Sequence, residues 1–287
     1  MLKTNTCNNQ NVNFTNAAFE RVKWPSNLAQ SLANKVIAVQ TTRAGFDVAT
    51  LDAQKKSCAE KTPYHHFNLG LHVGDNAERV NHNRQLVTQF INQQRLVDNQ
   101  AIETIKIQWL EQVHGSDIVE VTAVNDHPIT ADASITREKN VALAIMTADC
   151  LPILLTDNEG KEVAAIHGGW RPLAGNIIAK TIHKMHSKPT ALIAWLGPCI
   201  GHSAFEIGGE VKQAFVELNP MFHTAFLKQA NGKYLADLQL IARLQLASLG
   251  VTAVAALEEC TYQQTEKYYS YRKEKVTGRM ATIICRR

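Results

Sequence analysis

Three short segments of the chain each place a histidine or a cysteine directly after an apolar run. They are QVHG at 112–115, TADC at 147–150 and AIHGG at 165–169, and their metal-binding side chains are His114, Cys150 and His167. Imidazole and thiolate are the ligands that zinc prefers, so side chains of these types converging at strand ends form a candidate zinc site. Three protein ligands leave the fourth tetrahedral position to water or substrate, which is typical of catalytic zinc.

The spacing of the three residues does not match a short metal-binding motif, because the gaps between them are 36 and 17 residues. The same residues are therefore also compatible with Cys150 as a small core side chain and with both histidines hydrogen-bonded to backbone groups. Glycines next to His114 and His167 favour the metal site, since they allow a tightly turned backbone there.

A second group of polar side chains follows predicted strands and turns. Its members are Arg43 in TTR, Asn68 and His72 in FNLGLHVGD, Arg171 after Trp170, Arg272 in YSYRKEK and Arg279 in TGR. Arginines near a cleft suit a phosphate or a carboxylate, although an ordinary surface charge explains each arginine taken alone. The tyrosines of YYSY, at 268, 269 and 271, are compatible with an aromatic wall or with the two faces of a strand.

The composition is that of a globular protein, with 287 residues, 45% hydrophobic and 20% charged. A net charge of +4 lacks the dense basic stripe typical of nucleic-acid binders. No apolar run approaches a membrane span, and the polar N-terminus lacks the apolar region of a signal peptide. The six scattered cysteines include no C-x-x-C pair, so we expect a cytoplasmic protein whose thiols are free or bound to metal.

Apolar patterns predict a mixture of strands and helices. The predicted strands cover 35–43, 105–110, 118–124, 162–166, 192–196, 254–257 and 280–285, and 141–155 is predicted as strand, break and strand. The predicted helices begin after Asp75, which would cap with Glu78, and at Pro172, and two more contain 211–218 and 234–241, the last ending at Gly250. Because these elements do not alternate strictly, we predict an α+β fold with mixed sheets rather than a doubly wound one.

The predicted domain organisation is a loose tail over 1–20 followed by a single catalytic domain over 21–287. The polar stretch 46–66 is expected to form a long surface loop.

The ordered motifs of the chain resemble those of the YfiH-type family. They are NLGLHVGD, WLEQVHG, MTADCLPILL, VAAIHGGWRPL, LGPCIG, FEIGGEV, CTY and YSYRKEKVTGRM. The family is described variously as laccase-like polyphenol oxidase, purine nucleoside phosphorylase and peptidoglycan editing factor. The resemblance implies a sandwich of two related halves built from mixed β-sheets with helices packed outside. It also implies a metal held by His114, Cys150 and His167. The family usually reads HAGWRG where this chain has Gly168 and Pro172, so the placement of Arg171 is less certain than that of the ligands.

The first function that the resemblance implies is phosphorolysis of adenosine, inosine or methylthioadenosine to a base and ribose 1-phosphate, with adenosine deamination as a second activity. We expect zinc as the metal, with copper as the alternative, and a nucleoside and phosphate as the small-molecule partners. Arg43 and Arg272 are expected to hold phosphate, and His72 with Asn68 to contact ribose. The expected catalytic residues are thus Cys150, His72 and Arg43, and the expected substrate-binding residues are Asn68, Arg171 and Arg272. No nucleic acid, membrane or obligatory protein partner is expected.

Three other functions remain open from the sequence. A copper-dependent polyphenol oxidase is one, although the chain contains no His-x-His pair of the kind that feeds a multicopper centre. A hydrolase with Cys150 as the nucleophile, acting on peptidoglycan precursors, is the second. The third is a structural zinc protein, which would need a fourth ligand such as His72 to close the site.

Overall fold

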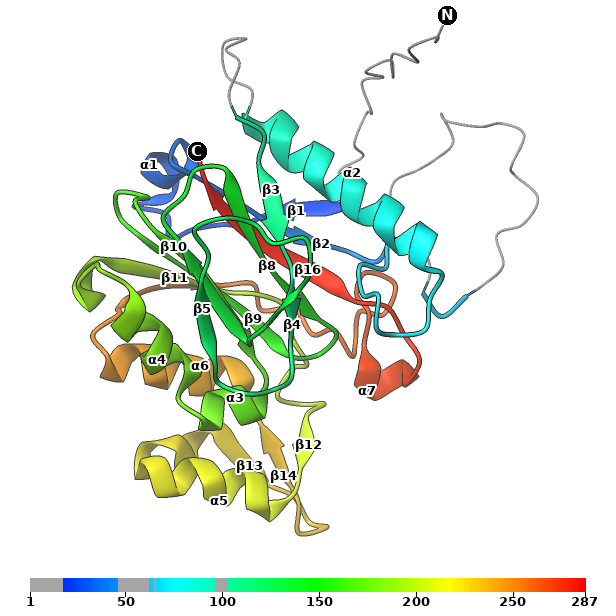
Figure 1. The fold of residues 1–287 in the computed structure, drawn as a ribbon. Coiled ribbons are helices and arrows are strands. Elements are labelled where there is room, and N and C mark those ends of the chain that lie inside the picture. The colour runs from blue at the N-terminus through cyan, green and yellow to red at the C-terminus, as the bar shows by residue number, and fades with distance from the viewer. Residues whose placement is uncertain (1–17, 46–61, 65, 96–102) are drawn as a thin grey trace, which may run out of the picture.

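The computed structural model describes residues 18–45, 62–64, 66–95 and 103–287. Two β-sheets lie face to face at the centre of the molecule (Figure 1). The first sheet contains, in spatial order, β1 (Phe19–Arg21), β2 (Val36–Thr41), β16 (Met280–Arg286), β8 (Val141–Thr147) and β3 (Lys106–Gln108). The second contains β15 (Ala253–Ala256), β11 (Leu192–Leu196), β9 (Leu151–Asp157), β10 (Val163–Gly168), β7 (Ala133–Thr136) and β5 (Ile118–Glu120).

Both sheets are mixed. In the first, β8 pairs antiparallel with β16 and parallel with β3. In the second, β9 lies antiparallel between β10 and β11, and the edge strands β5 and β15 are parallel to their neighbours. The predicted α+β class with mixed sheets in a sandwich is therefore confirmed.

Helices cover the outer face of each sheet. The long helix α2 (Ala77–Arg95) lies on the first sheet, and α3 (Trp170–Ala174), α4 (Ile177–Lys184) and α6 (Leu238–Ser248) lie on the second (Figure 1). Smaller elements complete the fold: α1 (Ala29–Ala33), α5 (Gly209–Leu218), α7 (Tyr271–Glu274), two 3₁₀ turns (Pro189–Ala191, Pro220–Ala225), the sheet of β12 (Glu206–Ile207), β14 (Tyr234–Ala236) and β13 (Phe226–Lys228), and the pair β4 (Leu110–Glu111) and β6 (Ile129–Thr130).

Alternating side chains on the central strands supply three apolar layers. Along β2, Val36 and Ala38 point between the two sheets, whereas Ile37 and Val39 join the cluster beneath α2. On β9, the side chain of Leu154 packs between the two sheets, whereas those of Ile153 and Leu155 pack against the outer helices. Strands buried on both faces explain why the sequence shows continuous apolar runs there rather than alternation.

The break predicted within 141–155 is where the chain passes from one sheet to the other. Residues 148–150 connect the end of β8 to the start of β9, and Asp149 adopts a φ of 93°. Pro152 lies within β9, where it pairs with His167. The crossing brings residues of both sheets to one site.

Several predicted boundaries were wrong for local reasons. The helix expected from Pro172 is divided at Gly175 and Asn176, where Asn176 has a φ of 59°. Tyr234 belongs to a strand rather than to the following helix, because Asp237 caps α6 by accepting a hydrogen bond from the backbone N–H of Leu240.

The start of α2 and the expected tail also differ from the prediction. Asn76, rather than Asp75, caps α2, since its side-chain oxygen accepts from the N–H of Arg79. Residues 1–17 of the expected tail lie outside the described part of the chain, as do 46–61 and 65 of the expected loop. Residues 18–20 are described, and Phe19 is buried in the core beside α2.

Within the part of the chain that the structure describes, none of the helices combines the length and the apolar character needed to cross a bilayer.

Candidate metal and active site

His114, Cys150 and His167 meet at one point of the structure. One ligand atom from each residue lies within 4.8 Å of the others, and Cys150 Sγ is 3.8 Å from His114 Nε2. The two imidazole rings are nearly perpendicular, with centroids 4.7 Å apart. Donor atoms of these types and at these separations can reach a single zinc ion, whose bonds to nitrogen and sulfur are about 2.0–2.3 Å, after small side-chain movements. The residues therefore fit a metal ion.

Each ligand is delivered by a different element. Cys150 stands at the crossing from β8 to β9, and His167 lies on β10 opposite Pro152 of β9. His114 comes from the turn between β4 and β5. His167 is buried, Cys150 is half-buried and His114 is exposed, so the site is covered on one side and open on the other.

Asp132, a fully buried residue between β6 and β7, connects two of the three ligands. Its carboxylate accepts hydrogen bonds from the backbone N–H groups of Val113 (3.2 Å), His114 (3.0 Å) and Gly115 (2.7 Å). It also lies 2.7 Å from His167 Nδ1. A histidine whose Nδ1 is held by a carboxylate presents Nε2 to a metal, which is the arrangement that fixes the ring in most metal sites.

The turn that carries His114 has an unusual backbone. His114 adopts a left-handed φ of 59°. For a residue other than glycine this conformation costs about 1–3 kcal/mol. The three backbone hydrogen bonds to Asp132 offset that cost, because each satisfies an N–H that the tight turn leaves without a partner in a strand. Strain held in this way is common at functional sites.

The same surroundings control the charge of Cys150 and His167 when no metal is bound. Burial acts to raise the pKa of Cys150, but the charge of His167 and hydrogen bonds from His114 and His167 outweigh it and lower this pKa to about 6. Burial acts to lower the pKa of His167, and the Cys150 thiolate and Asp132 raise it to about 9. At neutral pH the pair is thus a thiolate beside an imidazolium, and the thiolate is the form that binds metal.

The three ligands lie at the wall of a pocket with a volume of about 550 Å³. Its lining residues are His72, Gln112, His114, Met146, Thr147, Ala148, Asp149, Cys150, His167, Trp170, Arg171, Ile200, Phe205, Leu238, Tyr271, Arg272 and Arg279. Three arginines line the pocket together with a single carboxylate, that of Asp149. Both oxygens of that carboxylate are occupied, one by the hydroxyl of Thr261 and the other by the backbone N–H of Arg272. The pocket is therefore cationic.

Three of the predicted substrate residues line this pocket: His72, Arg171 and Arg272. Arg171 stacks over the ring of Trp170 at 4.4 Å. Arg272 lies over the ring of Phe205 at 5.3 Å, and its Nη1 donates to the carbonyl of Glu206. Burial, followed by the charges of Arg279 and Arg84, lowers the pKa of His72.

Arg43 and Asn68 are not among the residues that line the pocket. Arg43 is 2% exposed, and its guanidinium donates to Glu274 at 3.0 Å and to the carbonyls of Thr265 and Tyr268. The sequence indicated an arginine at a strand end, but β2 delivers it into the protein rather than into the pocket, so the structure does not bring Arg43 to the phosphate position expected of it.

Asn68 organises the loop that carries His72. Its side-chain oxygen accepts from the N–H groups of Gly70 (2.9 Å) and Arg279 (2.8 Å), and its amide donates to Asp75 and Gly70. With both ends of the amide engaged inside the protein, Asn68 acts on the pocket through the placement of His72 and Arg279.

The three tyrosines of YYSY divide between core and pocket. Tyr268 and Tyr269 are fully buried, and their hydroxyls donate to Glu259 and Glu20 and to the carbonyl of Tyr64, respectively. Tyr271 lines the pocket and is 53% exposed. Of the three tyrosines, Tyr271 alone is thus among the residues that line the pocket.

Asp132, Asp149 and Gln112 were missed as site residues. Gln112 joins the His114 turn to the end of β8, since its amide exchanges two hydrogen bonds with the backbone of Met146. One signal was present in the sequence: the letters TAD occur at 130–132 as well as at 147–149, and both aspartates are buried in the structure.

Comparison with known proteins gives a family match and several relatives. A family model described as "Multi-copper polyphenol oxidoreductase laccase" matches residues 50–287. The purine nucleoside phosphorylase YfiH of Escherichia coli is 41% identical over 222 residues, which cover 77% of this chain and 87% of that protein. A purine nucleoside phosphorylase of Pseudomonas aeruginosa is 40% identical over 251 residues, covering 87% of this chain and 93% of that protein.

A solved structure shows the same fold. The crystal structure of the Neisseria meningitidis protein NMB0706 superposes with a TM-score of 0.80 at 37% identity, covering 94% of this chain and 99% of that one.

Proposed function

The chain belongs to the family described as multi-copper polyphenol oxidoreductase laccase, and from this premise we propose that it is a metal-dependent purine nucleoside phosphorylase. The YfiH-type resemblance of its motifs is confirmed by relatives of that name. The proposed reaction joins a phosphate oxygen to C1′ of adenosine or inosine, breaks the bond from C1′ to the base nitrogen, and leaves that electron pair on the base, which takes up a proton. The products are the free base and ribose 1-phosphate.

The observation that carries the proposal is an open three-ligand site in the wall of a cationic pocket. No fourth histidine, cysteine or carboxylate joins the three ligands among the described residues, and His72 lines the pocket outside that group. A site with three protein ligands leaves a position for substrate, which favours catalysis over a structural role. In the same described part of the chain, Arg171, Arg272 and Arg279 form no ion pair with a carboxylate, so their charges are available for an anion such as phosphate.

The pocket also suits the other half of the substrate. Trp170, Phe205 and Leu238 supply apolar and aromatic surface for a purine ring. A volume of about 550 Å³ lies within the range of roughly 300–1,000 Å³ that is usual for small-molecule sites. Zinc held by the three ligands would act as a Lewis acid beside the sugar or the base.

The test is a comparison of nucleosides with and without phosphate on protein of known metal content. Zinc-loaded protein should convert adenosine to adenine, and inosine to hypoxanthine, only when phosphate is present, with ribose 1-phosphate as the second product. C150A should lose this activity. Phosphate-independent formation of inosine from adenosine would reveal the deaminase activity. If zinc-loaded protein and C150A release base at the same background rate, the assignment is wrong.

A copper-dependent oxidase is the second candidate, because the family description names polyphenol oxidation. Cu(II) outcompetes zinc at many nitrogen and sulfur sites. The described residues provide one His-Cys-His group, which is too small for the several copper ions of a multicopper centre. Metal analysis of protein purified without added copper, followed by assay of phenol oxidation with each metal, separates the two candidates.

A further inference from the structure

Two chemically different groups of residues line the pocket, an apolar wall and a polar wall. Trp170, Ile200, Phe205 and Leu238 belong to, or pack against, the apolar cluster beneath the second sheet. Tyr271, Arg279 and His72 instead come from the segments around α7, the start of β16 and the loop before α2.

His72 and Arg279 are held together by hydrogen bonds between their two segments. The backbone N–H of Leu69 donates to the carbonyl of Arg279 at 3.1 Å, and the N–H of Arg279 donates to the side chain of Asn68 at 2.8 Å. The charge of Arg279 contributes, after burial, to the lowered pKa of His72, as expected for two groups that face the same space.

The side chain of Arg279 is prepositioned, with part of its guanidinium left for a ligand. Its stem lies tightly against Gly70, where a Cβ atom would approach Arg279 Cγ to 2.8 Å. Nη1 donates to the carbonyls of Thr277 (3.1 Å) and Gly278 (2.9 Å), and these are its guanidinium's hydrogen bonds within the described residues. Nη2 and Nε therefore remain for an oxyanion, which arginine binds through a pair of parallel N–H groups.

All three pocket arginines lie over an aromatic ring, Arg279 over that of Tyr271 at 5.8 Å. Arg171 and Arg272 lie over the rings of Trp170 and Phe205 in the apolar wall, and Arg272 also donates to the carbonyl of Glu206. Both therefore frame the apolar wall, whereas the charge of Arg279 is coupled to those of Cys150 and Asp149 beside the metal ligands.

We propose that Arg279 and His72 form the phosphate subsite, and that the purine base lies against Trp170 and Phe205 on the apolar wall. This proposal rests on the proposed function and assigns to Arg279 the role that the sequence assigned to Arg43. It places C1′ of the ribose between the two walls, beside the metal ligands. Phosphate reaches the ribose from the Arg279 wall as the base departs along the aromatic wall.

Two matched variants test this orientation in the metal-loaded full-length protein. R279Q should raise the KM for phosphate by about tenfold or more, because it removes a charge-assisted pair of donors, and should leave the KM for adenosine within about threefold. F205L, which keeps an apolar side chain but removes the aromatic face, should raise the KM for adenosine and leave the KM for phosphate unchanged. R243A, at an exposed ion pair with Glu258 outside the pocket, is the control and should change neither.

Binding of inorganic phosphate to the metal-loaded protein without nucleoside gives a readout that does not depend on activity. Calorimetry should show weaker phosphate binding for R279Q and ordinary binding for F205L. G70A provides a second variant that keeps the charge and displaces the side chain, and it should weaken phosphate binding as well. The proposal is overturned if R279Q raises the KM for adenosine while phosphate binding is retained. Failure of the proposed function has a different signature: phosphate then binds the wild-type protein through Arg279, but no base is released.

Discussion

At the scale of single residues, Cys150 shows how position sets reactivity. Its thiol faces His114 at 3.8 Å and is coupled to the charge of His167, so its pKa falls to about 6 although burial opposes ionisation. Cys285 lies in the core without such partners, and burial raises its pKa to about 12. Cys150 is therefore poised to bind metal as a thiolate, whereas the thiol of Cys285 stays protonated and inert.

The first prediction concerns alkylation of Cys150 after zinc is removed with a chelator. Because the pKa is lowered, the thiolate persists as pH falls, and the rate of alkylation by iodoacetamide should be half-maximal near pH 6. An unperturbed thiol reaches that point near pH ~8.5. Mass spectrometry of the peptide that contains Cys150 measures the rate without interference from the other cysteines.

Zinc-loaded protein is the control and should be protected, since a metal-bound thiolate is a weak nucleophile. A half-maximal rate near pH 8.5 in the metal-free protein would show that the histidines do not stabilise the thiolate.

At the scale of elements, the site depends on hydrogen bonds between the segments that connect the strands rather than on any one strand. Asp132 binds the turn 113–115 to β10 with four contacts, and Asp149 binds the crossing between the sheets to the start of α7. Through these hydrogen bonds, each carboxylate holds together segments that are distant in the sequence.

The second prediction is that D132N weakens zinc binding by roughly 10–100-fold, the usual effect of removing the carboxylate that orients a ligand histidine. The side chain of asparagine also places an N–H₂ donor beside the backbone N–H groups of the turn 113–115, which need an acceptor. Competition with a chromophoric chelator measures the zinc affinity.

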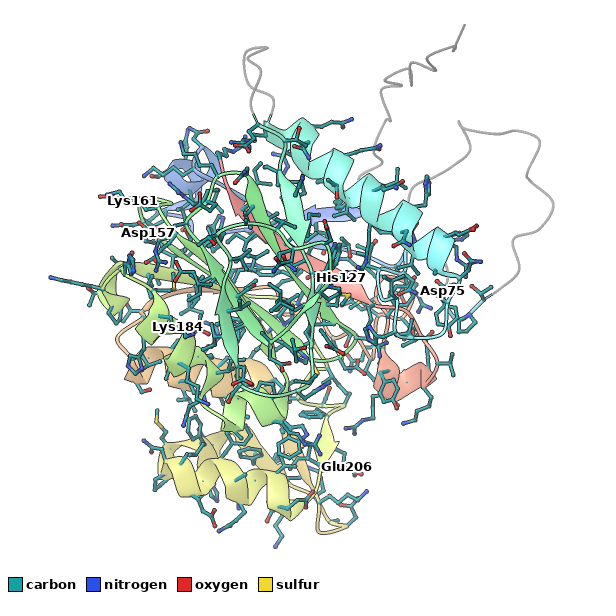
Figure 2. All side chains as sticks on the ribbon, viewed as in Figure 1. Asp75, His127, Asp157, Lys161, Lys184 and Glu206 are labelled. Atoms are coloured by element: carbon teal, nitrogen blue, oxygen red, sulfur yellow. The ribbon has the colours of Figure 1, made fainter. Side chains whose placement is uncertain are left out.

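D157N is the matched control for this prediction. Asp157 is also buried and accepts from three backbone N–H groups, those of Glu159, Lys161 and Glu162, but it does not line the pocket. In Figure 2 it lies well apart from Glu206, whose carbonyl accepts from Arg272 of the pocket. It should lose stability without losing zinc affinity. If D132N and D157N bind zinc with equal affinity, the role of Asp132 is to stabilise the fold and not to orient the metal ligands.

The layers of the fold and the candidate ligands His114, Cys150 and His167, which the structure brings together, could be read from the sequence, whereas the hydrogen-bonded connections between segments could not. Continuous apolar runs identify strands buried on both faces, and a histidine or cysteine at the end of such a run is visible without coordinates. The role of Asp132 is signalled only by the repeated letters TAD, because its partners lie 17–19 residues earlier and 35 residues later and are brought together by packing. For the same reason Arg43, and not Arg279, was expected to hold phosphate, although Arg43 is buried in the protein and Arg279 lines the pocket.

At the scale of the whole molecule, Arg43 holds the segment 265–274 against the end of β2. Its guanidinium contacts Glu274, two backbone carbonyls and the ring of Tyr269 at 4.8 Å. Tyr271 and Arg272, which lie between these contacts, line the pocket. Arg43 therefore supports the pocket indirectly, by holding in place the segment that contains Tyr271 and Arg272.

The third prediction is that R43A lowers the free energy of unfolding by about 3 kcal/mol, because it breaks a largely buried ion pair and leaves carbonyls without donors. The KM for phosphate of the folded protein should stay unchanged. R243A removes an exposed ion pair and should change stability by no more than about 0.5 kcal/mol. Denaturant unfolding gives both values. If R43A leaves the stability unchanged and raises the KM for phosphate, the prediction is wrong and Arg43 binds the substrate.

The central position of β16 in the first sheet has a consequence for how the protein is made. β16 pairs with β2 on one side and β8 on the other, so two strands synthesised much earlier have no common neighbour until it arrives. Contacts between segments so distant in the sequence form slowly. A ribosome-bound chain that has released β2 and β8 still exposes two unpaired strand edges, which favour aggregation. Synthesis of this protein is therefore expected to depend on chaperones until Arg279 and β16 emerge and complete the sheet and the pocket together.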